Sequence, residues 1–361
     1  MSDRLLTYAQ ALREALEQAM ADDPSVIVIG EGVPDPKAIF GTTSGLIERF
    51  GPNRVFDMPL SENGMTGVCI GAALSGMRPV MVHQRIDFSL LAMDQIVNNA
   101  AKWHYMFDGQ ASVPLVVRVI IGRGWGQGPQ HSQGLHGMFA QVPGLKVVMP
   151  STPHDAKGML AAAIRDPNPV LFVEHRWLHP VTAPVPDGRY EVPLGAANIL
   201  KGGDPDSVTI AGFSYAALEA LEAAKALSSC DGIEVEVIDM RSARPLDSST
   251  VCGSVRRTGR LLVLDPAFES GGVSGELIAQ VTEDCFASLA AAPERLCLPD
   301  HPGPTSPYLS ETYYPGPQQI AERVLRMLGK PLDLGGSSAV MQALARTGRH
   351  DVPHTSFSGP F

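Results

Sequence analysis

The feature that most constrains the fold is an alternation of short apolar runs with helical patterns, repeated in two blocks. In the first block, runs such as Val26–Ile29 and Val170–Glu174 predict buried strands, with helical segments between them. Strands that are apolar on both faces and alternate with helices are typical of parallel sheets covered by helices. The sequence therefore predicts an α/β protein with two doubly wound, mostly parallel-sheet domains.

The two blocks are separated by a stretch rich in Pro, Gly and Asp. Such composition is typical of a linker, because these residues favour turns over regular elements. We therefore predict a first domain over residues 1–180, a linker over 181–206 and a second domain over 207–330. The polar, Gly- and Ser-containing residues 331–361 are expected to form a flexible tail.

Charge and hydropathy exclude several classes of protein. The 361 residues carry a net charge of −10, which argues against binding to nucleic acid. The chain has no apolar run long enough for a transmembrane helix, and its N-terminus is typical of an amphipathic helix with a capping box of Thr7 and Gln10. We expect a cytoplasmic protein that does not bind membranes. Its five scattered cysteines are expected to be reduced.

The first candidate site is Glu62, which stands just before the small, apolar segment 64–76. That segment predicts a buried helix that allows close backbone approach. The glutamate has two interpretations. It is either a charge that interacts favourably with the helix dipole, or a partly buried carboxyl whose raised pKa suits acid–base chemistry.

Two more candidate regions follow predicted strands. His83-Gln84-Arg85 and Asp87-Phe88 come after the strand 79–82, and ligands in open α/β sheets bind at the carboxyl ends of strands. A Gly-rich loop at 122–128 leads to His131, but its spacing matches neither common nucleotide-binding motif. The alternatives are core packing for Phe88, a solvated ion pair for Arg85 and Asp87, and a structural role for His131.

Several segments together resemble one family across roughly residues 5–328. DMPLSENGMTGVCIGAALSGMRPVMV, FSLLAMDQIVNNAAKWHYM, PQHSQ and PGLKVVMPSTPHDAKGML resemble the beta subunit of the thiamine-diphosphate-dependent decarboxylating component of 2-oxo acid dehydrogenases. EVIDMRSARPLD and TGRLLVLDPAFESGGVSGELIAQV fit the same family. The resemblance implies a transketolase-like pyrimidine-binding domain followed by a transketolase C-terminal domain. It also implies oxidative decarboxylation of a 2-oxo acid, with acyl transfer to a lipoyl carrier.

The resemblance assigns roles to the candidate residues. Glu62 would hydrogen-bond the aminopyrimidine ring of thiamine diphosphate, with Gln84 as a further cofactor contact, and Phe88 would pack on that ring. His131 would lie near the substrate and the acyl-transfer chemistry. The same resemblance implies a K⁺ site made mostly of backbone carbonyl oxygens. Its residues would be Leu115, Ala163, Ile164, Asp166 and Asn168.

The resemblance also implies a partner. The family holds the cofactor diphosphate through Mg²⁺ with a Gly-Asp-Gly segment, and these 361 residues contain none. We therefore expect an alpha subunit to complete the site and hold Mg²⁺ in an α₂β₂-like assembly. A lipoyl acyltransferase core is the expected further partner.

His83 and Arg85 depart from the family pattern and are candidates for the substrate side of the site. Arg85 could pair bidentately with a carboxylate or phosphate, so the substrate need not be pyruvate. Two alternatives therefore stay open. One is half of a non-oxidative thiamine diphosphate enzyme, such as a split transketolase or carboligase. The other is a non-enzymatic subunit that binds no cofactor.

Overall fold

The computed structural model describes residues 4–124, 126–330, 338–346 and 351–352. The chain divides into two compact units. Among the described residues, the first contains the chain up to Gly122 together with Gln130–Leu194. The second contains Arg123–Pro129 and the chain from Gly195 onward. The division at Leu194 falls within the predicted linker, whereas the short segment at 123–129 was expected in the first domain.

The first unit is built on a parallel sheet whose strand order is β6-β7-β5-β4-β2-β3. Its central strands are mostly apolar and are buried along their whole length, as expected for a sheet covered by helices on both faces. The strands are β2 (Val26–Gly30), β3 (Val55–Phe56), β4 (Arg78–His83), β5 (Val116–Ile121), β6 (Lys146–Val148) and β7 (Val170–His175).

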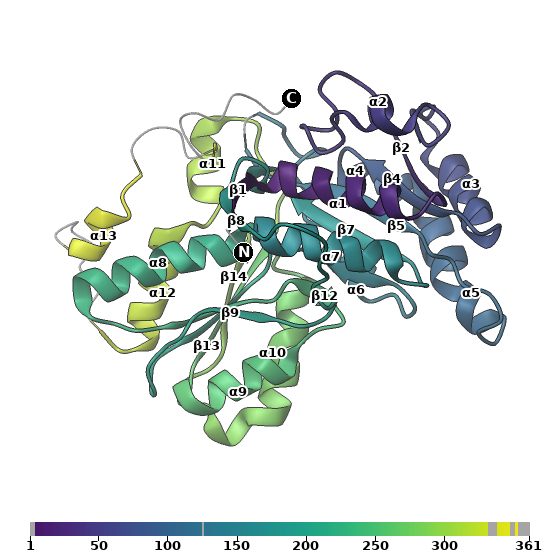
Figure 1. Ribbon diagram of the computed structural model, residues 1–361. Coiled ribbons are helices and arrows are strands. Elements are labelled where there is room, and N and C mark those ends of the chain that lie inside the picture. The colour runs from purple at the N-terminus through teal and green to yellow at the C-terminus, as the bar shows by residue number, and fades with distance from the viewer. Residues whose placement is uncertain (1–3, 125, 331–337, 347–350, 353–361) are drawn as a thin grey trace. The chain divides into compact units, whose positions relative to one another are not determined.

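Helices flank this sheet, and α1 packs against α7 (Figure 1). The predicted capping box of α1 is confirmed: Thr7 Oγ1 accepts from the Gln10 amide at 3.1 Å, and Gln10 Oε1 accepts from the Thr7 amide at 2.9 Å. The helices are α1 (Tyr8–Asp22), α2 (Leu46–Phe50), α3 (Glu62–Leu74), α4 (Ile86–Ser89), α5 (Ala101–Met106), α6 (His136–Ala140) and α7 (Pro153–Arg165). A short 3₁₀ turn, Arg176–Leu178, follows β7.

Two helices of the first unit differ from the prediction. The single long helix expected over 90–106 is instead a 3₁₀ turn at Leu90–Ala92, a π-helical stretch at Asp94–Ala100 and the short α5. Helix α3 is buried on one side only, since Val68 is 58% exposed. The small side chains of this helix would allow close packing on any of its faces. The sequence therefore did not reveal which face would be buried against the rest of the unit.

The second unit has its own sheet, in the order β14-β13-β10-β11-β9. All its pairs are parallel except that of β9 with β11. Its strands are β9 (Asn198–Lys201), β10 (Thr209–Gly212), β11 (Glu236–Asp239), β13 (Leu261–Phe268) and β14 (Glu294–Leu298), with β12 (Ser242–Arg244) between β11 and β13 along the chain. Its helices are α8 (Tyr215–Asp231), α9 (Ser248–Thr258), α10 (Val273–Cys285), α11 (Pro307–Tyr313), α12 (Pro317–Met327) and α13 (Ala339–Ala343), with a 3₁₀ turn at Phe286–Ser288.

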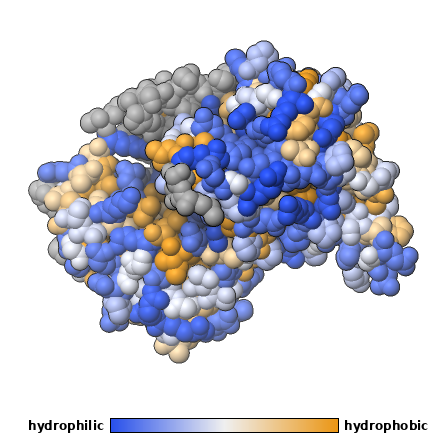
Figure 2. Space-filling view, viewed as in Figure 1, coloured by the Kyte–Doolittle hydropathy of each residue, from blue (hydrophilic) through white to orange (hydrophobic). Residues whose placement is uncertain are grey.

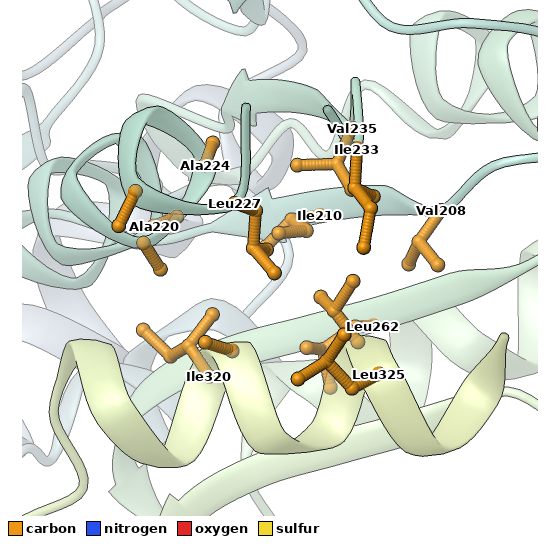
Figure 3. Close-up of a cluster of buried hydrophobic side chains, with 14 of the residues drawn as sticks. Val208, Ile210, Ala220, Ala224, Leu227, Ile233, Val235, Leu262, Ile320 and Leu325 are labelled. Atoms are coloured by element: carbon orange, nitrogen blue, oxygen red, sulfur yellow. The ribbon is translucent and has the colours of Figure 1, made fainter. Parts of the chain in front are cut away.

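A continuous apolar core holds the second unit together. Figure 3 shows Ala220 and Leu227 of α8 facing Ile320 and Leu325 of α12, with Ile210 of the sheet among them. All of these side chains are buried. The predicted α/β fold class is therefore confirmed for both units.

Parts of the predicted linker and tail have regular structure. In the linker, β8 (Thr182–Val185) pairs antiparallel with β1 (Arg4–Thr7), and β9 forms one edge of the second sheet. In the tail, α13 places Val340 in the core of the second unit, which differs from the flexible tail predicted there. The rest of the predicted tail, at 331–337, 347–350 and 353–361, lies outside the described residues.

The viewed surface is mainly hydrophilic, with hydrophobic side chains in separate groups (Figure 2). Among the described residues, none of the helices has both the length and the apolar character needed to cross a membrane. All five cysteines are free thiols, as predicted.

Candidate functional site

The candidate residues gather at the carboxyl ends of the central strands of the first unit. Strand β4 lies between β2 and β5, and β5 lies between β4 and β7. Because the strands are parallel, the segments that follow them leave from one edge of the sheet. His83 ends β4 and His175 ends β7, so the residues that follow them leave this edge two strands apart.

Glu62 is the first residue of α3 and is only 8% exposed. Its carboxyl makes no hydrogen bond or ion pair with another described residue. Thr66 fixes this end of the helix, because its hydroxyl donates to the Glu62 carbonyl at 2.7 Å and lies 3.3 Å from Met81 Sδ in β4. The helix therefore holds a buried carboxyl near the end of β4.

Glu31 is a second acid at this edge, and the sequence analysis missed it. It directly follows β2, and its pKa is raised, first by burial and then by the negative charges of Glu62 and Asp57. Glu31 and Glu62 are therefore close enough to interact electrostatically. The signal for Glu31 was its position after a buried strand, between two glycines.

Phe88 and His131 lie together, although 43 positions separate them in the chain. Their ring centroids lie 5.4 Å apart in an edge-to-face arrangement. Gln133 Nε2 donates to Asp87 Oδ1 at 2.6 Å and thereby ties the His131 loop to the short helix that carries Phe88. Gln84 is exposed, and its Nε2 donates to the Glu31 carbonyl at 3.1 Å.

The two residues that depart from the family pattern are both buried. His83 is 2% exposed, and burial lowers its pKa to about 4. Arg85 is 5% exposed and lies over the ring of Phe40, 5.9 Å from its centroid. Arg176 lies over the same ring at 4.2 Å. The sequence analysis missed Arg176 and Phe40. Arg176 follows a buried strand, whereas nothing in the sequence marked Phe40.

Several buried polar atoms at this edge have no hydrogen-bond partner among the described residues. They include Glu31 Oε1, His83 Nε2, Asp87 Oδ2 and Ser132 Oγ. Native proteins leave few buried polar atoms unsatisfied, so such a group indicates a ligand or ordered water. A polar heterocycle that donates and accepts hydrogen bonds, such as the aminopyrimidine implied by the resemblance, fits these donors and acceptors.

The residues of the implied K⁺ site lie around the loop between α7 and β7. The carbonyls of Ile164 and Asp166 both accept from Arg78 Nη1, at 2.9 and 3.4 Å. The Leu115 carbonyl accepts from the Val170 amide at 2.9 Å. Each carbonyl oxygen has a second lone pair, so these oxygens can also bind a hard cation.

The side-chain carboxylate of Asp166 has different partners from its backbone carbonyl. Lys146 Nζ lies 2.9 Å from Asp166 Oδ1 and 2.7 Å from Oδ2, and the Asn168 amide donates to Oδ1 at 2.9 Å. The guanidinium of Arg78 and the ammonium of Lys146 therefore already bring positive charge to this loop. The donor set fits K⁺, and Arg78 would share two of its oxygens.

Three other residues that follow or end strands of the first sheet, Arg123, His175 and His179, have partners within the protein. Arg123 of the Gly-rich loop binds Glu219 and the Pro315 carbonyl within the second unit. His179 Nε2 lies 3.1 Å from Glu174 Oε2, while His175 Nδ1 accepts from the Trp177 amide. Across the ranges that the structure describes, no group of three or more His, Cys, Asp or Glu side chains could hold a metal ion.

Comparison with known proteins matches both halves of the chain. The description "Transketolase, pyrimidine binding domain" fits residues 4–181, and "Transketolase, C-terminal domain" fits residues 195–320. Among solved structures, a split-gene transketolase in an inactive beta4 tetramer has a TM-score of 0.72 at 21% identity, covering 90% of this chain and 98% of that one. That likeness supports the fold.

Closer relatives are oxidoreductase beta subunits. The chain is 44% identical to the acetoin:2,6-dichlorophenolindophenol oxidoreductase subunit beta of Cupriavidus necator, over 88% of this chain and 96% of the relative. It is 42% identical to the mitochondrial pyruvate dehydrogenase E1 component subunit beta-1 of Oryza sativa subsp. japonica, over 89% of this chain and 86% of the relative. The chain therefore belongs to the 2-oxo acid dehydrogenase E1 beta-subunit family, the transketolase-fold oxidoreductase subunits that include those of pyruvate dehydrogenase and of the acetoin enzymes.

Proposed function

We propose that this beta subunit acts with an alpha subunit and thiamine diphosphate to decarboxylate a 2-oxo acid oxidatively and pass the acyl group to a lipoyl carrier. The observation that carries this proposal is the buried, unpaired carboxyl of Glu62 at the sheet edge where Phe88 and His131 meet. Thiamine diphosphate, when bound, supplies a carbon nucleophile for the substrate carbonyl and accepts the electrons left by decarboxylation.

In this proposal Glu62 holds a proton at a ring nitrogen of the aminopyrimidine. A carboxyl can donate there only while it carries its proton. The Glu62 side chain is only 8% exposed, and the acid Glu31 lies close enough to interact with it electrostatically.

Phe88, Gln84 and His131 have supporting roles in this proposal. The half-buried ring of Phe88 packs on the aminopyrimidine and keeps water from it. Gln84 offers a side-chain amide near Glu31 as a further cofactor contact. His131, held edge-on to Phe88, would give or take a proton at the substrate oxygen, because imidazole is suited to acid–base work near neutral pH.

We propose an alpha subunit as the partner that holds Mg²⁺ and the cofactor diphosphate. The 361 residues contain no Gly-Asp-Gly segment, and the relatives are beta subunits by name. Large apolar side chains on and beside α3 are exposed, including Leu60, Val68 and Leu91, as on surfaces that bind other proteins. We propose an α₂β₂-like assembly that docks on a lipoyl acyltransferase core, as the family resemblance implies. The cytoplasmic location stays a proposal, because the named relatives include both bacterial and mitochondrial proteins.

The test replaces Glu62 by Gln in the complex of this chain with its alpha subunit. We expect the rate of lipoyl acylation to fall by about 100-fold or more, since general acid–base groups contribute that much. The Tm should stay within a few degrees, because the Glu62 side chain has no partner to lose. Glu48→Gln, which removes an exposed carboxyl from α2, is the control and should keep full activity.

Three results would contradict the proposal. The first is full turnover by the Glu62→Gln complex, which would support a non-enzymatic subunit. The second is a product formed only by joining two carbonyl substrates, without lipoyl acylation. That result would favour the alternative of a split transketolase or carboligase. The third is the absence of decarboxylation of any 2-oxo acid by the wild-type complex.

We also propose that K⁺ binds the carbonyl oxygens of Leu115, Ala163, Ile164, Asp166 and Asn168. These oxygens come from the end of α7, the loop that joins it to β7 and the residue before β5, so the bound ion should stabilise the first unit. We expect the Tm of the full chain to be several degrees higher in KCl than in tetramethylammonium chloride at equal ionic strength. Equal Tm values in the two salts would contradict K⁺ binding.

A further inference from the structure

His131 lies in a segment that has no regular structure to hold it. Among the described residues, those from 122 to 135 form neither a helix nor a strand between β5 and α6. Gly124, Gly126 and Gly128 in this segment have φ values of 74°, 71° and 68°, which glycine adopts without strain. The position of the His131 ring therefore depends on contacts with side chains of other elements.

Helix α4 supplies two of these contacts. Phe88 lies edge-on to the His131 ring, with 5.4 Å between the ring centroids. Gln133, two residues after His131, donates from Nε2 to Asp87 Oδ1 at 2.6 Å. Because Asp87 and Phe88 are neighbours in the chain, one short helix contacts the His131 segment at two points.

Helix α4 is itself fixed in place by hydrogen bonds and burial. The Phe88 amide donates to the Arg85 carbonyl at 3.2 Å, and the Ser89 hydroxyl donates to the Ile86 carbonyl at 2.6 Å. The side chains of Ile86 and Ser89 are fully buried. Asp87 is therefore carried by a rigid turn, and groups that must hold a catalytic side chain in one geometry need such support.

Asp87 and His131 also interact through their charges. Burial raises the pKa of Asp87, while its hydrogen bond from Gln133 and the positive charges of His131 and Arg85 act in the opposite direction. Because burial disfavours an isolated carboxylate, the charged form of Asp87 is stabilised by a cation beside it. The effect is mutual, so the carboxylate stabilises the protonated imidazole of His131 to the same extent.

The second carboxylate oxygen of Asp87 is available for a partner. Oδ2 is buried and makes no hydrogen bond with another described residue. Contacts within catalytic groups are often long without substrate and shorten when it binds. The nearby acid Glu31 interacts instead with the charges of Glu62 and Asp57. Asp87 is therefore the acid for which the structure shows an interaction with His131.

Resting on the proposed function, we propose that Asp87 is the positioning residue for His131. Through Gln133 it holds the loop, and its carboxylate balances the positive charge that the imidazole acquires when it takes a proton from a substrate oxygen. When His131 returns that proton, the pair is again a neutral imidazole and a carboxylate. Asp87 itself neither gains nor loses a proton in this cycle. A neutral amide at this position should therefore keep the contact with Gln133 and lose the charge balance.

The first test measures lipoyl acylation by Asp87→Asn in the complex with the alpha subunit. We expect kcat to fall by about tenfold or more, because proton transfer by His131 loses its counter-charge. KM should change by less than about threefold, since the substrate keeps its contacts. The acid side of the pH–rate profile should move to lower pH, because without the carboxylate a lower pH is needed to protonate the imidazole.

Two further variants separate the charge of Asp87 from its packing. Asp87→Glu keeps the charge, so it should regain part of the rate and have the pH–rate profile of the wild type. Asp108→Asn, which removes an exposed carboxyl just after α5, is the matched control and should change neither kcat nor the profile. A folded Asp87→Asn complex, judged by its Tm, with the kcat and pH–rate profile of the wild type would overturn the inference.

A second test needs neither turnover nor a folded Asp87→Asn variant. NMR of the full chain with ¹³C-labelled aspartate follows the titration of each carboxyl, and Asp87→Glu identifies the Asp87 signal by its loss. In His131→Gln the titration midpoint of Asp87 should rise by about half a pH unit or more, because a neighbouring cation is removed. An unchanged midpoint would overturn the inference. A shifted midpoint in a protein whose complex turns over no 2-oxo acid would count against the proposed function alone.

Discussion

Some titratable side chains at the candidate site are buried away from water. Burial changes their pKa on folding, so the free energy of unfolding depends on pH. His83 is the clearest example. It is 2% exposed, and its pKa is lowered by burial to about 4, from an ordinary value near 6.5. The folded protein therefore keeps the imidazole neutral at a pH where the unfolded chain would protonate it.

His83 should make the protein less stable as the pH falls. Its folded pKa lies below its unfolded pKa, so its contribution is complete above about pH 6.5 and is lost as the pH falls towards 4. Between pH 7 and pH 5 the loss should be about 2 kcal/mol. In urea denaturation of the full chain, His83→Phe should reduce the difference in unfolding free energy between these pH values by that amount.

The matched control for His83 is His104→Gln, which removes an exposed imidazole from α5. This control should leave the pH difference as it is in the wild type. An equally steep loss of stability in His83→Phe would show that other groups cause it. His179 is the main competitor, because burial lowers its pKa as well.

Among the elements, β5 and β7 contact each other through a buried ion pair that their apolar sequence pattern does not reveal. Both strands appear as apolar runs, yet each contributes one fully buried charge. Arg118 Nε and Nη2 donate to the two carboxylate oxygens of Glu174 at 2.6 and 2.9 Å, and both side chains are 0% exposed. His179 also binds this carboxylate, and its ring contacts Phe40 at 5.6 Å. The pair therefore helps to hold His179, whose ring lies beside Phe40.

Removing one partner of this pair should be far more harmful than removing both. Glu174→Gln leaves the Arg118 charge buried without its counter-charge, which should cost about 3–5 kcal/mol of unfolding free energy. Arg118→Met together with Glu174→Leu removes both charges, and this double variant should regain most of the loss. Urea denaturation of the two variants measures the difference. If the double variant were as unstable as the single one, the desolvation argument would fail.

At the scale of the whole molecule, the cofactor should need both subunits. The described residues offer polar atoms for the aminopyrimidine, while the chain lacks the Gly-Asp-Gly segment expected for Mg²⁺ and diphosphate. By calorimetry with Mg²⁺, the chain alone should bind thiamine diphosphate at least 100-fold more weakly than its complex with the alpha subunit, because charge-assisted contacts to the diphosphate would be missing. Equal affinity in the two samples would contradict the shared site.

The sequence predicted most of the regular elements of both units, since buried strands of a parallel sheet appear as continuous apolar runs. Elements that depend on distant partners were missed. Strand β8 exists because β1 pairs with it, and α13 because the core of the second unit receives Val340. The π-helical stretch at Asp94–Ala100 was also missed, because no local pattern separates it from an α-helix.

The sequence by itself determined the fold class, the family and the residues that carry its motif, because these depend on periodicity and on residues adjacent in the chain. Glu62, Phe88 and His131 were proposed in this way. Only the tertiary structure revealed that Arg85 and Arg176 share the ring of Phe40, and that Glu31 adds a second acid beside Glu62. The physical reason is that burial and charge interactions depend on distance in space, and a parallel sheet brings together strand ends that lie far apart along the chain.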